Sequence, residues 1–96
     1  MSYAQVTSKG QVVLVTPTGK VPLTRDDGHQ LIFHGAPVCV NGISLERYQR
    51  TIFFVVGGTS YTLNACSLGR LFKGEATRCR IYPVEINALG GVRHDR

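Results

Sequence analysis

The chain has 96 residues, of which 43% are hydrophobic and 18% are charged. This length predicts one domain with a modest core, because cores seldom divide below roughly 100 residues. The low charge content excludes a disordered polyelectrolyte. The sequence has no run of ~18 apolar residues and no cationic, apolar leader, so we expect a cytoplasmic protein without a membrane span.

The net charge of +5 comes from 11 basic and 6 acidic residues, and it is concentrated in one segment. Residues 1–46 and 81–96 each balance to zero, whereas residues 47–80 carry six cations against Glu75 alone. Five of these cations are arginines, whose planar, forked donors suit phosphate or carboxylate. We therefore expect a partner to bind this segment, through Arg47, Arg50, Arg70, Lys73, Arg78 and Arg80.

Short apolar runs stopped by tight-turn residues predict a mainly β fold. Apolar character on both faces predicts a central strand for Gln11–Thr16, and Pro22 predicts an edge strand because proline lacks the N–H donor. Arg25–Gly28 is expected as a turn. The strands expected in the first part of the chain are Tyr3–Thr7, Gln11–Thr16, Lys20–Thr24 and His29–His34.

Asn41-Gly42 and Gly57-Gly58 predict two hairpins with two-residue turns, which need residues that tolerate positive φ. Glu46–Gln49 is expected as a short polar connection between them. In the second hairpin this turn sets Val56 opposite Thr59, and the strand pairing follows from it. One face of that hairpin is then apolar and should be core: Ile52, Phe54, Val56, Tyr61 and Leu63.

The opposite face of the same hairpin is polar except for Phe53 and Val55, which lie near Thr62. Two exposed apolar side chains on a polar face need a cover. A neighbouring helix of the same chain is one explanation. The other is an interface with a second chain.

Asn64 predicts the N-cap of a short helix over 65–73, which Gly74 would end. A strand is expected over Glu75–Tyr82, and Pro83 should end its pairing. The fold predicted is therefore a small antiparallel sheet or partly open barrel of five to seven strands with one short helix. We expect a single domain over residues 1–86 and a flexible C-terminal tail over 87–96.

The three cysteines, Cys39, Cys66 and Cys79, are odd in number and widely spaced. This pattern predicts buried small hydrophobes in a reducing compartment and no disulfide framework. No CxxC or HxxxH pair occurs, and His29 and His34 are expected on opposite faces of a strand. We therefore expect no metal site and no cofactor.

Two motifs that resemble catalytic or phosphate-binding elements have structural explanations. Asp26-Asp27 precede Gly28, and adjacent carboxylates in a turn diverge. Gly57-Gly58-Thr59 lacks the lysine and the loop length of a phosphate-binding loop. No Ser/His/Asp or Cys/His set occurs in a recognisable context, so we expect a non-enzymatic protein.

Arg78, Arg80 and Tyr82 alternate along one predicted strand and should share one face. Arg70 and Lys73 precede them on the predicted helix. Single-stranded nucleic acid binds where cations for phosphate are interleaved with a flat ring for a base. The alternatives are a solvated outward face and a surface for an acidic protein.

One fragment, Ala4-Gln5-Val6-Thr7-Ser8-Lys9-Gly10-Gln11-Val12-Val13-Leu14, resembles the opening of AbrB/MazE-type swapped-hairpin DNA-binding proteins. The resemblance covers 11 of the 96 residues. In that family the segment leads into an acidic, proline-led helix that ends at glycine and organises the dimer. Here the residues 15–19 turn back instead, so the resemblance implies shared hairpin chemistry and no function is transferred from it.

The leading hypothesis is therefore a small basic module that binds nucleic acid through residues 47–80 and through Tyr82, which follows them. The alternative is a small interaction or inhibitor protein, of the kind that phages and plasmids encode, docking through Phe53, Val55 and Thr62. A homodimer formed through an exposed strand edge is a third possibility.

Overall fold

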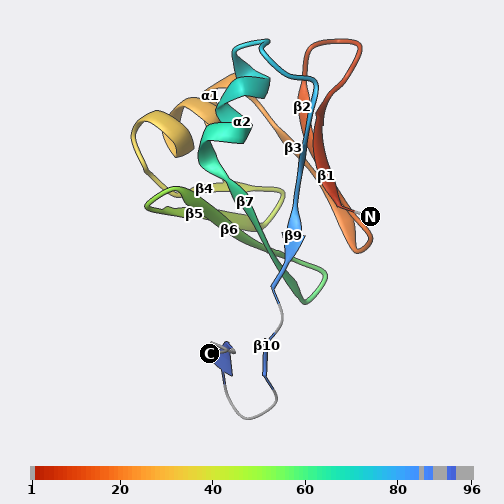
Figure 1. Ribbon diagram of the computed structural model, residues 1–96, viewed down its shortest axis with the longest axis vertical. Helices are drawn as coiled ribbons and strands as arrows, with labels where there is room; N and C mark the ends of the chain where they lie inside the picture. The colour runs from red at the N-terminus through yellow and green to blue at the C-terminus, as the bar shows by residue number, and fades with distance from the viewer. Residues whose placement is uncertain (1, 85, 88–90, 93–96) are drawn as a thin grey trace.

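The computed structural model describes residues 2–84, 86–87 and 91–92. These residues form two antiparallel sheets that enclose a core, with short helices at one end (Figure 1). Sheet A has the strand order β3-β2-β1-β8, and sheet B has the order β4-β5-β6-β7-β9. The predicted class, a mainly β and partly open antiparallel fold, is confirmed.

Sheet A consists of β1 (Tyr3–Val6), β2 (Val12–Thr16), β3 (Gly19–Leu23) and β8 (Arg78–Arg80). Its strands β1, β2 and β3 form two consecutive hairpins. Val6 pairs with Val12 in the first hairpin, and Thr16 pairs with Gly19 in the second. The apolar strand β2 is central and β3, which carries Pro22, is an edge strand, as the sequence predicts.

Sheet B consists of β4 (Val38–Val40), β5 (Ile43–Tyr48), β6 (Thr51–Val56), β7 (Thr59–Asn64) and β9 (Tyr82–Pro83). The predicted register of the β6–β7 hairpin is confirmed, because Val56 pairs with Thr59 and Phe54 pairs with Tyr61. The prediction of a polar connection over Glu46–Gln49 is wrong. Residues 46–48 belong to β5, and the chain reverses at Gln49, whose φ is 57°.

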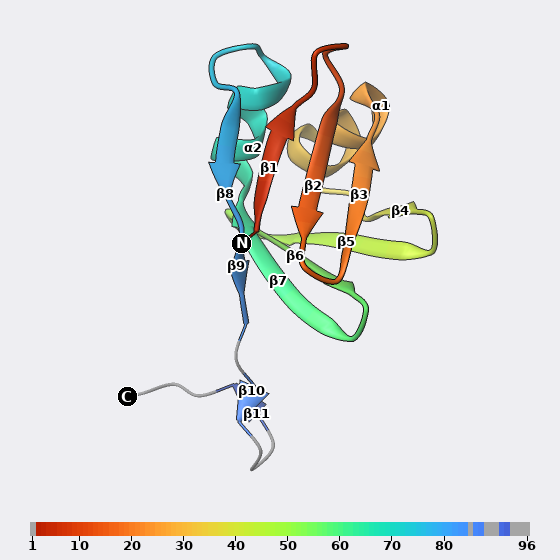
Figure 2. The same cartoon turned by 90° about the vertical axis from the view of Figure 1, so that its right-hand side faces the viewer.

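A nearly straight segment joins the two sheets. β8 lies at one edge of sheet A, β9 lies at one edge of sheet B, and only Ile81 separates them. Figure 2 shows the two strands in line. Ile81 is buried, and its backbone N–H donates to the Ser2 carbonyl at 3.1 Å. The opposite edges, β3 and β4, are not paired with each other, so the two sheets stay open on that side.

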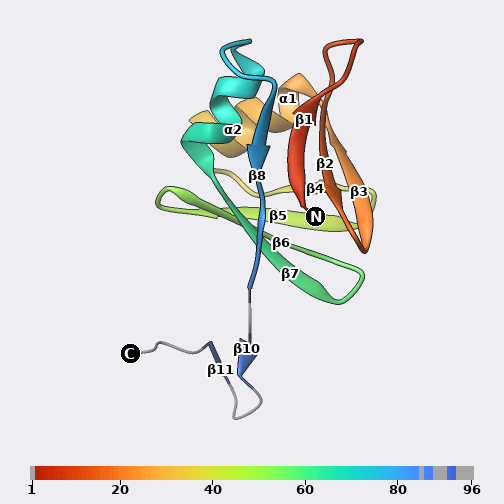
Figure 3. The ribbon, with the colours of Figure 1, turned by 45° about the vertical axis from the view of Figure 1, so that its right-hand side comes forward.

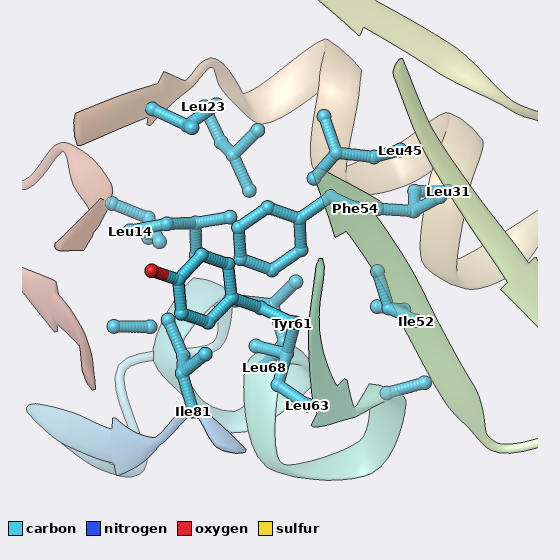
Figure 4. Close-up of a cluster of buried hydrophobic side chains, with 14 of the residues drawn as sticks. Leu14, Leu23, Leu31, Leu45, Ile52, Phe54, Tyr61, Leu63, Leu68 and Ile81 are labelled. Atoms are coloured by element: carbon cyan, nitrogen blue, oxygen red, sulfur yellow. The ribbon is translucent and has the colours of Figure 1, made fainter. Parts of the chain in front are cut away.

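Figure 3 shows that the two sheets cross, and the hydrophobic side chains drawn in Figure 4 form the core between them. Phe54 and Tyr61 stack with their ring centroids 5.5 Å apart. All five residues predicted for the core face of the β6–β7 hairpin are buried. The aliphatic side chains around the two rings include Leu14, Leu23, Leu31, Leu45, Leu63 and Leu68.

The segment between β3 and β4 is helical, so the predicted strand over His29–His34 is wrong. α1 (Arg25–Gly28) continues into a π-helical turn, η1 (His29–Phe33). Thr24 and Asp27 form a capping box, in which each side chain accepts from the other residue's backbone N–H. Such a box satisfies two free N–H groups at a helix start, which explains why the expected turn extends into a helix.

The second helix, α2 (Ala65–Phe72), agrees with the predicted range of 65–73 to within one residue. The Asn64 side chain accepts from the Ser67 N–H at 3.1 Å, and Gly74 follows the helix with a φ of 78°. α2 packs against η1, β7 and β8. Among the described residues, no helix is long and apolar enough to cross a membrane.

Two short strands, β10 (Ile86–Asn87) and β11 (Gly91–Val92), pair with each other beyond sheet B. The flexible tail predicted for 87–96 falls mostly outside the described residues.

Candidate nucleic-acid interface

The structure divides the six cations of residues 47–80 between two places. Arg78 and Arg80 lie on β8, in sheet A, and Tyr82 follows them on β9. The other four line a cavity between η1, α2 and the β5–β6 turn: Arg47, Arg50, Arg70 and Lys73. The cations of this segment therefore form two separate groups and no single continuous patch.

The β8 group lies on the outer face of sheet A. Arg78 pairs with Gln5 and Arg80 pairs with Tyr3 on the neighbouring strand β1. The guanidinium carbon of Arg78 lies 4.3 Å from the centroid of the Tyr3 ring, and its Nη2 lies 3.4 Å from the Gln5 Oε1. A guanidinium stacked in this way is held in place while its outer plane stays accessible.

The alternation along β8 and β9 sorts side chains by face. Cys79 and Ile81 turn towards the core, whereas Arg78, Arg80 and Tyr82 are exposed. Tyr82 is 53% exposed, and the guanidinium carbon of Arg80 lies 6.0 Å from its ring centroid. The predicted common face of the three residues is therefore confirmed. Burial raises the pKa of the Cys79 thiol, which stays protonated beneath this face.

The outer face of sheet A is basic and uncovered. Both helices lie behind the sheet in Figure 2. The four strands contain no acidic residue, and exposed Lys20 on β3 adds a third cation to Arg78 and Arg80. A cavity of about 310 Å³ is lined by Ser2, Tyr3, Arg78, Cys79 and Arg80. Anions are attracted to such a face because no carboxylate of its own four strands neutralises it.

Tyr3 is the residue that sequence reasoning missed. It lies 75 positions before Arg78 in the printed sequence, and the two meet only because β1 pairs with β8. The alternating pattern of Tyr3–Thr7 predicts a strand, but it gives no information on which later strand pairs with it. The only signal that the sequence offers is that Tyr3 is aromatic and precedes a small apolar residue, Ala4.

The second group surrounds a cavity of about 330 Å³. Arg47, which is half-buried, donates from Nε to the Gln49 carbonyl at 2.7 Å and from Nη1 to the Ile32 carbonyl. These bonds attach the β5–β6 turn to η1. Arg70 and Lys73 extend from α2 towards the same cavity, which Glu75 also lines.

The outer face of sheet B carries the apolar residues that the sequence singles out. Phe53 is 42% exposed and Val55 is 51% exposed, and neither helix covers them. Phe53 pairs with Thr62, which in turn pairs with Tyr82. Tyr48, at the end of β5, is also exposed, at 68%. Of the two predicted covers, a helix of the same chain is excluded for the described residues.

The expectation for the cysteines is wrong for two of the three. Cys39 and Cys66 are exposed, and only Cys79 is half-buried. His29 and His34 were expected on opposite faces, but their ring centroids lie 4.9 Å apart. The π-helical turn brings residues five positions apart together, as the bond from the His34 N–H to the His29 carbonyl shows. No cluster of three metal-ligating side chains occurs among the described residues.

No model of a known family matches the chain, and no curated protein or solved structure matches it either. Function must therefore be inferred from the chemistry of these surfaces.

Proposed function

We propose that this protein is a non-enzymatic module that binds single-stranded nucleic acid across the outer face of sheet A and along β8 and β9. The observation that supports it best is the alternating row Arg78, Arg80 and Tyr82, flanked by Tyr3, beside a sheet whose four strands contain no acidic residue.

The row offers both interactions that a single strand needs. Residues two positions apart on a strand are about 6.6 Å apart, so the three side chains extend over about 13 Å. Phosphates bind Arg80 and Lys20, while one base stacks on Tyr82 and another on the Arg78 guanidinium that Tyr3 supports. Each base stacked on an aromatic ring contributes roughly 1–3 kcal/mol.

A single strand suits this surface better than a duplex. The bases of a duplex are stacked on one another, and a protein reads them by inserting a helix or ribbon into a groove. Here the helices lie on the far side of sheet A, and the rings belong to Tyr3 on β1 of sheet A and Tyr82 on the edge strand β9 of sheet B. Unstacked bases can reach these rings, whereas paired bases cannot.

Fluorescence anisotropy with labelled oligonucleotides that carry 5′-hydroxyl ends tests the proposal. We expect single strands to bind more tightly than duplexes of the same sequence. For the two phosphate contacts at Arg80 and Lys20, the plot of log affinity against log salt should have a slope of about −1.4. Affinity that does not change with salt, or no binding at low salt, would contradict the proposal.

Matched charge variants locate the surface. Arg80→Gln should weaken binding about tenfold and make the salt slope shallower by about 0.7, because one phosphate contact is lost. Arg50→Gln removes the same charge from the other group and should leave the affinity within about twofold. Equal losses in the two variants would show that binding depends on net charge and not on sheet A.

Tyr82 supplies a test of stacking that is independent of charge. Tyr82→Ala should lower the affinity about tenfold without changing the salt slope, whereas Tyr82→Phe should bind as the parent does. A loss of affinity in Tyr82→Phe equal to that in Tyr82→Ala would argue against stacking.

A protein-binding role remains a second candidate, because the outer face of sheet B exposes Tyr48, Phe53 and Val55. Phe53→Asp should leave the circular dichroism spectrum unchanged and abolish capture of a partner from nuclease-treated lysate. Phe33→Asp changes a phenylalanine elsewhere that is more exposed, at 58%, and should retain capture. Unfolding of Phe53→Asp would show instead that Phe53 is needed by the core.

Self-association through a strand edge also stays a prediction. β4 is the more suitable edge, because β3 carries Pro22, which cannot donate to an added strand. Light scattering of the purified protein distinguishes a monomer from a dimer.

A further inference from the structure

The cavity between η1, the β5–β6 turn and α2 is a separate basic site that the proposed function does not use. Its volume is about 330 Å³, and its lining includes Phe33, Arg47, Arg50, Gly69, Arg70 and Lys73. A volume of this size lies within the range of small-molecule sites, about 300–1,000 Å³. The lining comes from three elements that are distant in sequence, so folding assembles it.

Charge at this cavity is unbalanced. Four cations face a single carboxylate, that of Glu75. Like charges gathered on one concave surface repel one another and raise the local concentration of anions. Arg47 is held by its bonds to the carbonyls of Gln49 and Ile32, which use two of its five N–H donors. The remaining donors are positioned before any ligand arrives.

The floor of the cavity is apolar and includes Ile32, Ala65 and Gly69. Gly69 is buried within α2, where an added Cβ would lie 3.7 Å from the Ile32 Cγ2, an ordinary contact. Alanine would therefore fit this position, and it would be a better helix former than glycine. The missing methyl group leaves room on the floor of the cavity.

Phe33 provides a flat surface at the rim. It is 58% exposed at the end of η1. Together with Lys73 it also lines an adjoining cavity of about 440 Å³, to which Arg25 and His29 contribute. The two cavities meet at Phe33 and Lys73, so an aromatic ring can stack at the point where cations are available on both sides.

From this arrangement we infer that the cavity binds a phosphate monoester attached to a flat heterocyclic ring. Arg50, Arg70 and Lys73 hold the phosphate, Arg47 fixes its orientation, and the ring stacks on Phe33. The same chemistry occurs in a free nucleoside monophosphate and at the 5′-phosphorylated end of a strand. The inference does not depend on the proposed function, because sheet A contributes no residue to the cavity.

Calorimetric titration with adenosine monophosphate, adenosine and inorganic phosphate tests both halves of the ligand. We expect adenosine monophosphate to bind at least about tenfold more tightly than adenosine or inorganic phosphate, because each of these fragments lacks one set of contacts. A parallel arm compares 5′-phosphorylated with 5′-hydroxyl oligonucleotides. Preference for the phosphorylated strand without binding of the free monophosphate supports the site and identifies a strand end as its ligand.

Variants separate this site from the sheet A surface. Arg50→Gln and Arg70→Gln should each weaken monophosphate binding about tenfold, whereas Arg78→Gln should leave it within about twofold. Phe33→Leu should weaken the monophosphate but leave inorganic phosphate unchanged. Equal losses of monophosphate affinity in Arg50→Gln and Arg78→Gln would overturn the inference. It would also be overturned if the monophosphate bound no better than adenosine and 5′-phosphorylated strands bound no better than 5′-hydroxyl strands.

The reactivity of a native cysteine, Cys66, gives a second measure of ligand binding that needs no substitution. Exposed Cys66 lines the cavity, while exposed Cys39 lies on β4 in sheet B. Saturating adenosine monophosphate, or the 5′-phosphorylated strand, should slow alkylation of Cys66 by iodoacetamide several-fold and leave that of Cys39 unchanged. Equal protection of Cys66 and Cys39 would contradict occupation of the cavity. Failure of both ligands to protect Cys66 would contradict it too.

Discussion

Gly28 is a residue whose identity is determined by a close approach, not by its backbone angles. Its φ is −63°, which any residue adopts, yet an added Cβ would lie 2.6 Å from the Phe72 ring. This contact lets α1 and η1 pack directly on α2. We expect Gly28→Ala to lower the free energy of unfolding by about 1–3 kcal/mol, because the half-buried ring must move.

Urea denaturation measures this loss. Gly28→Ala combined with Phe72→Leu should recover part of it, because the shorter side chain leaves space for the methyl group. A wild-type midpoint in Gly28→Ala would show that Phe72 rotates away without cost.

Thr18 connects the two sheets through its hydroxyl group. Its Oγ1 donates to the Val56 carbonyl at 2.7 Å and lies 3.0 Å from the hydroxyl of buried Tyr61. We expect Thr18→Val to lower the free energy of unfolding by about 1 kcal/mol. In a double-mutant cycle with Tyr61→Phe, the pair should show a coupling energy of about 0.5–1 kcal/mol. Strict additivity of the two changes would show that the contact contributes nothing to stability.

At the scale of elements, α2 contains a glycine, Gly69, that destabilises the helix and also lines the basic cavity. Gly69 lies in the interior of the helix, where alanine is favoured by about 1 kcal/mol. Because the added methyl group makes only an ordinary contact with Ile32, we expect Gly69→Ala to raise the free energy of unfolding by up to about 1 kcal/mol. Thermal and urea melts measure the gain, and a destabilised variant would show that the helix cannot accept the methyl group.

The elements that the sequence predicts correctly are those with local rules. The Gly57-Gly58 turn sets the register of the β6–β7 hairpin, and the alternation of that hairpin identifies its buried face. α1 was missed although its signal is local too. Thr24 and Asp27 have the spacing of a capping box, but the aspartates and Gly28 also fit a turn, and the apolar residues after them fit a strand.

The candidate site depends in part on contacts that local sequence rules do not predict. The common face of Arg78, Arg80 and Tyr82 follows from strand alternation, which the sequence supplies. The separation of Arg70 and Lys73 from that face does not, because it depends on how α2 packs beside η1 and β8. Tyr3 joins the site by pairing between distant strands. Contacts of this kind are set by the packing of the whole molecule, not by local propensity.

At the scale of the whole molecule, Ile81 is the residue at which the chain passes from one sheet to the other. It is buried at the point where β8 leaves sheet A and β9 enters sheet B, and it packs in the core that both sheets share. On either side of it, the Val6 N–H donates to the Thr77 carbonyl and the Val84 N–H donates to the Ser60 carbonyl. The segment therefore ties β1 to β7 through one continuous stretch of chain.

Because the core is continuous across Ile81, we expect the two sheets to unfold together. Ile81→Ala should lower the free energy of unfolding by about 2–5 kcal/mol, a large part of the about 5–15 kcal/mol that a small domain has. Amide hydrogen exchange should show a similar loss of protection in β2 of sheet A and β6 of sheet B. Loss confined to sheet A would mean that sheet B is stable alone, so that β8 and β9 rest against a preformed sheet instead of joining two halves of one core.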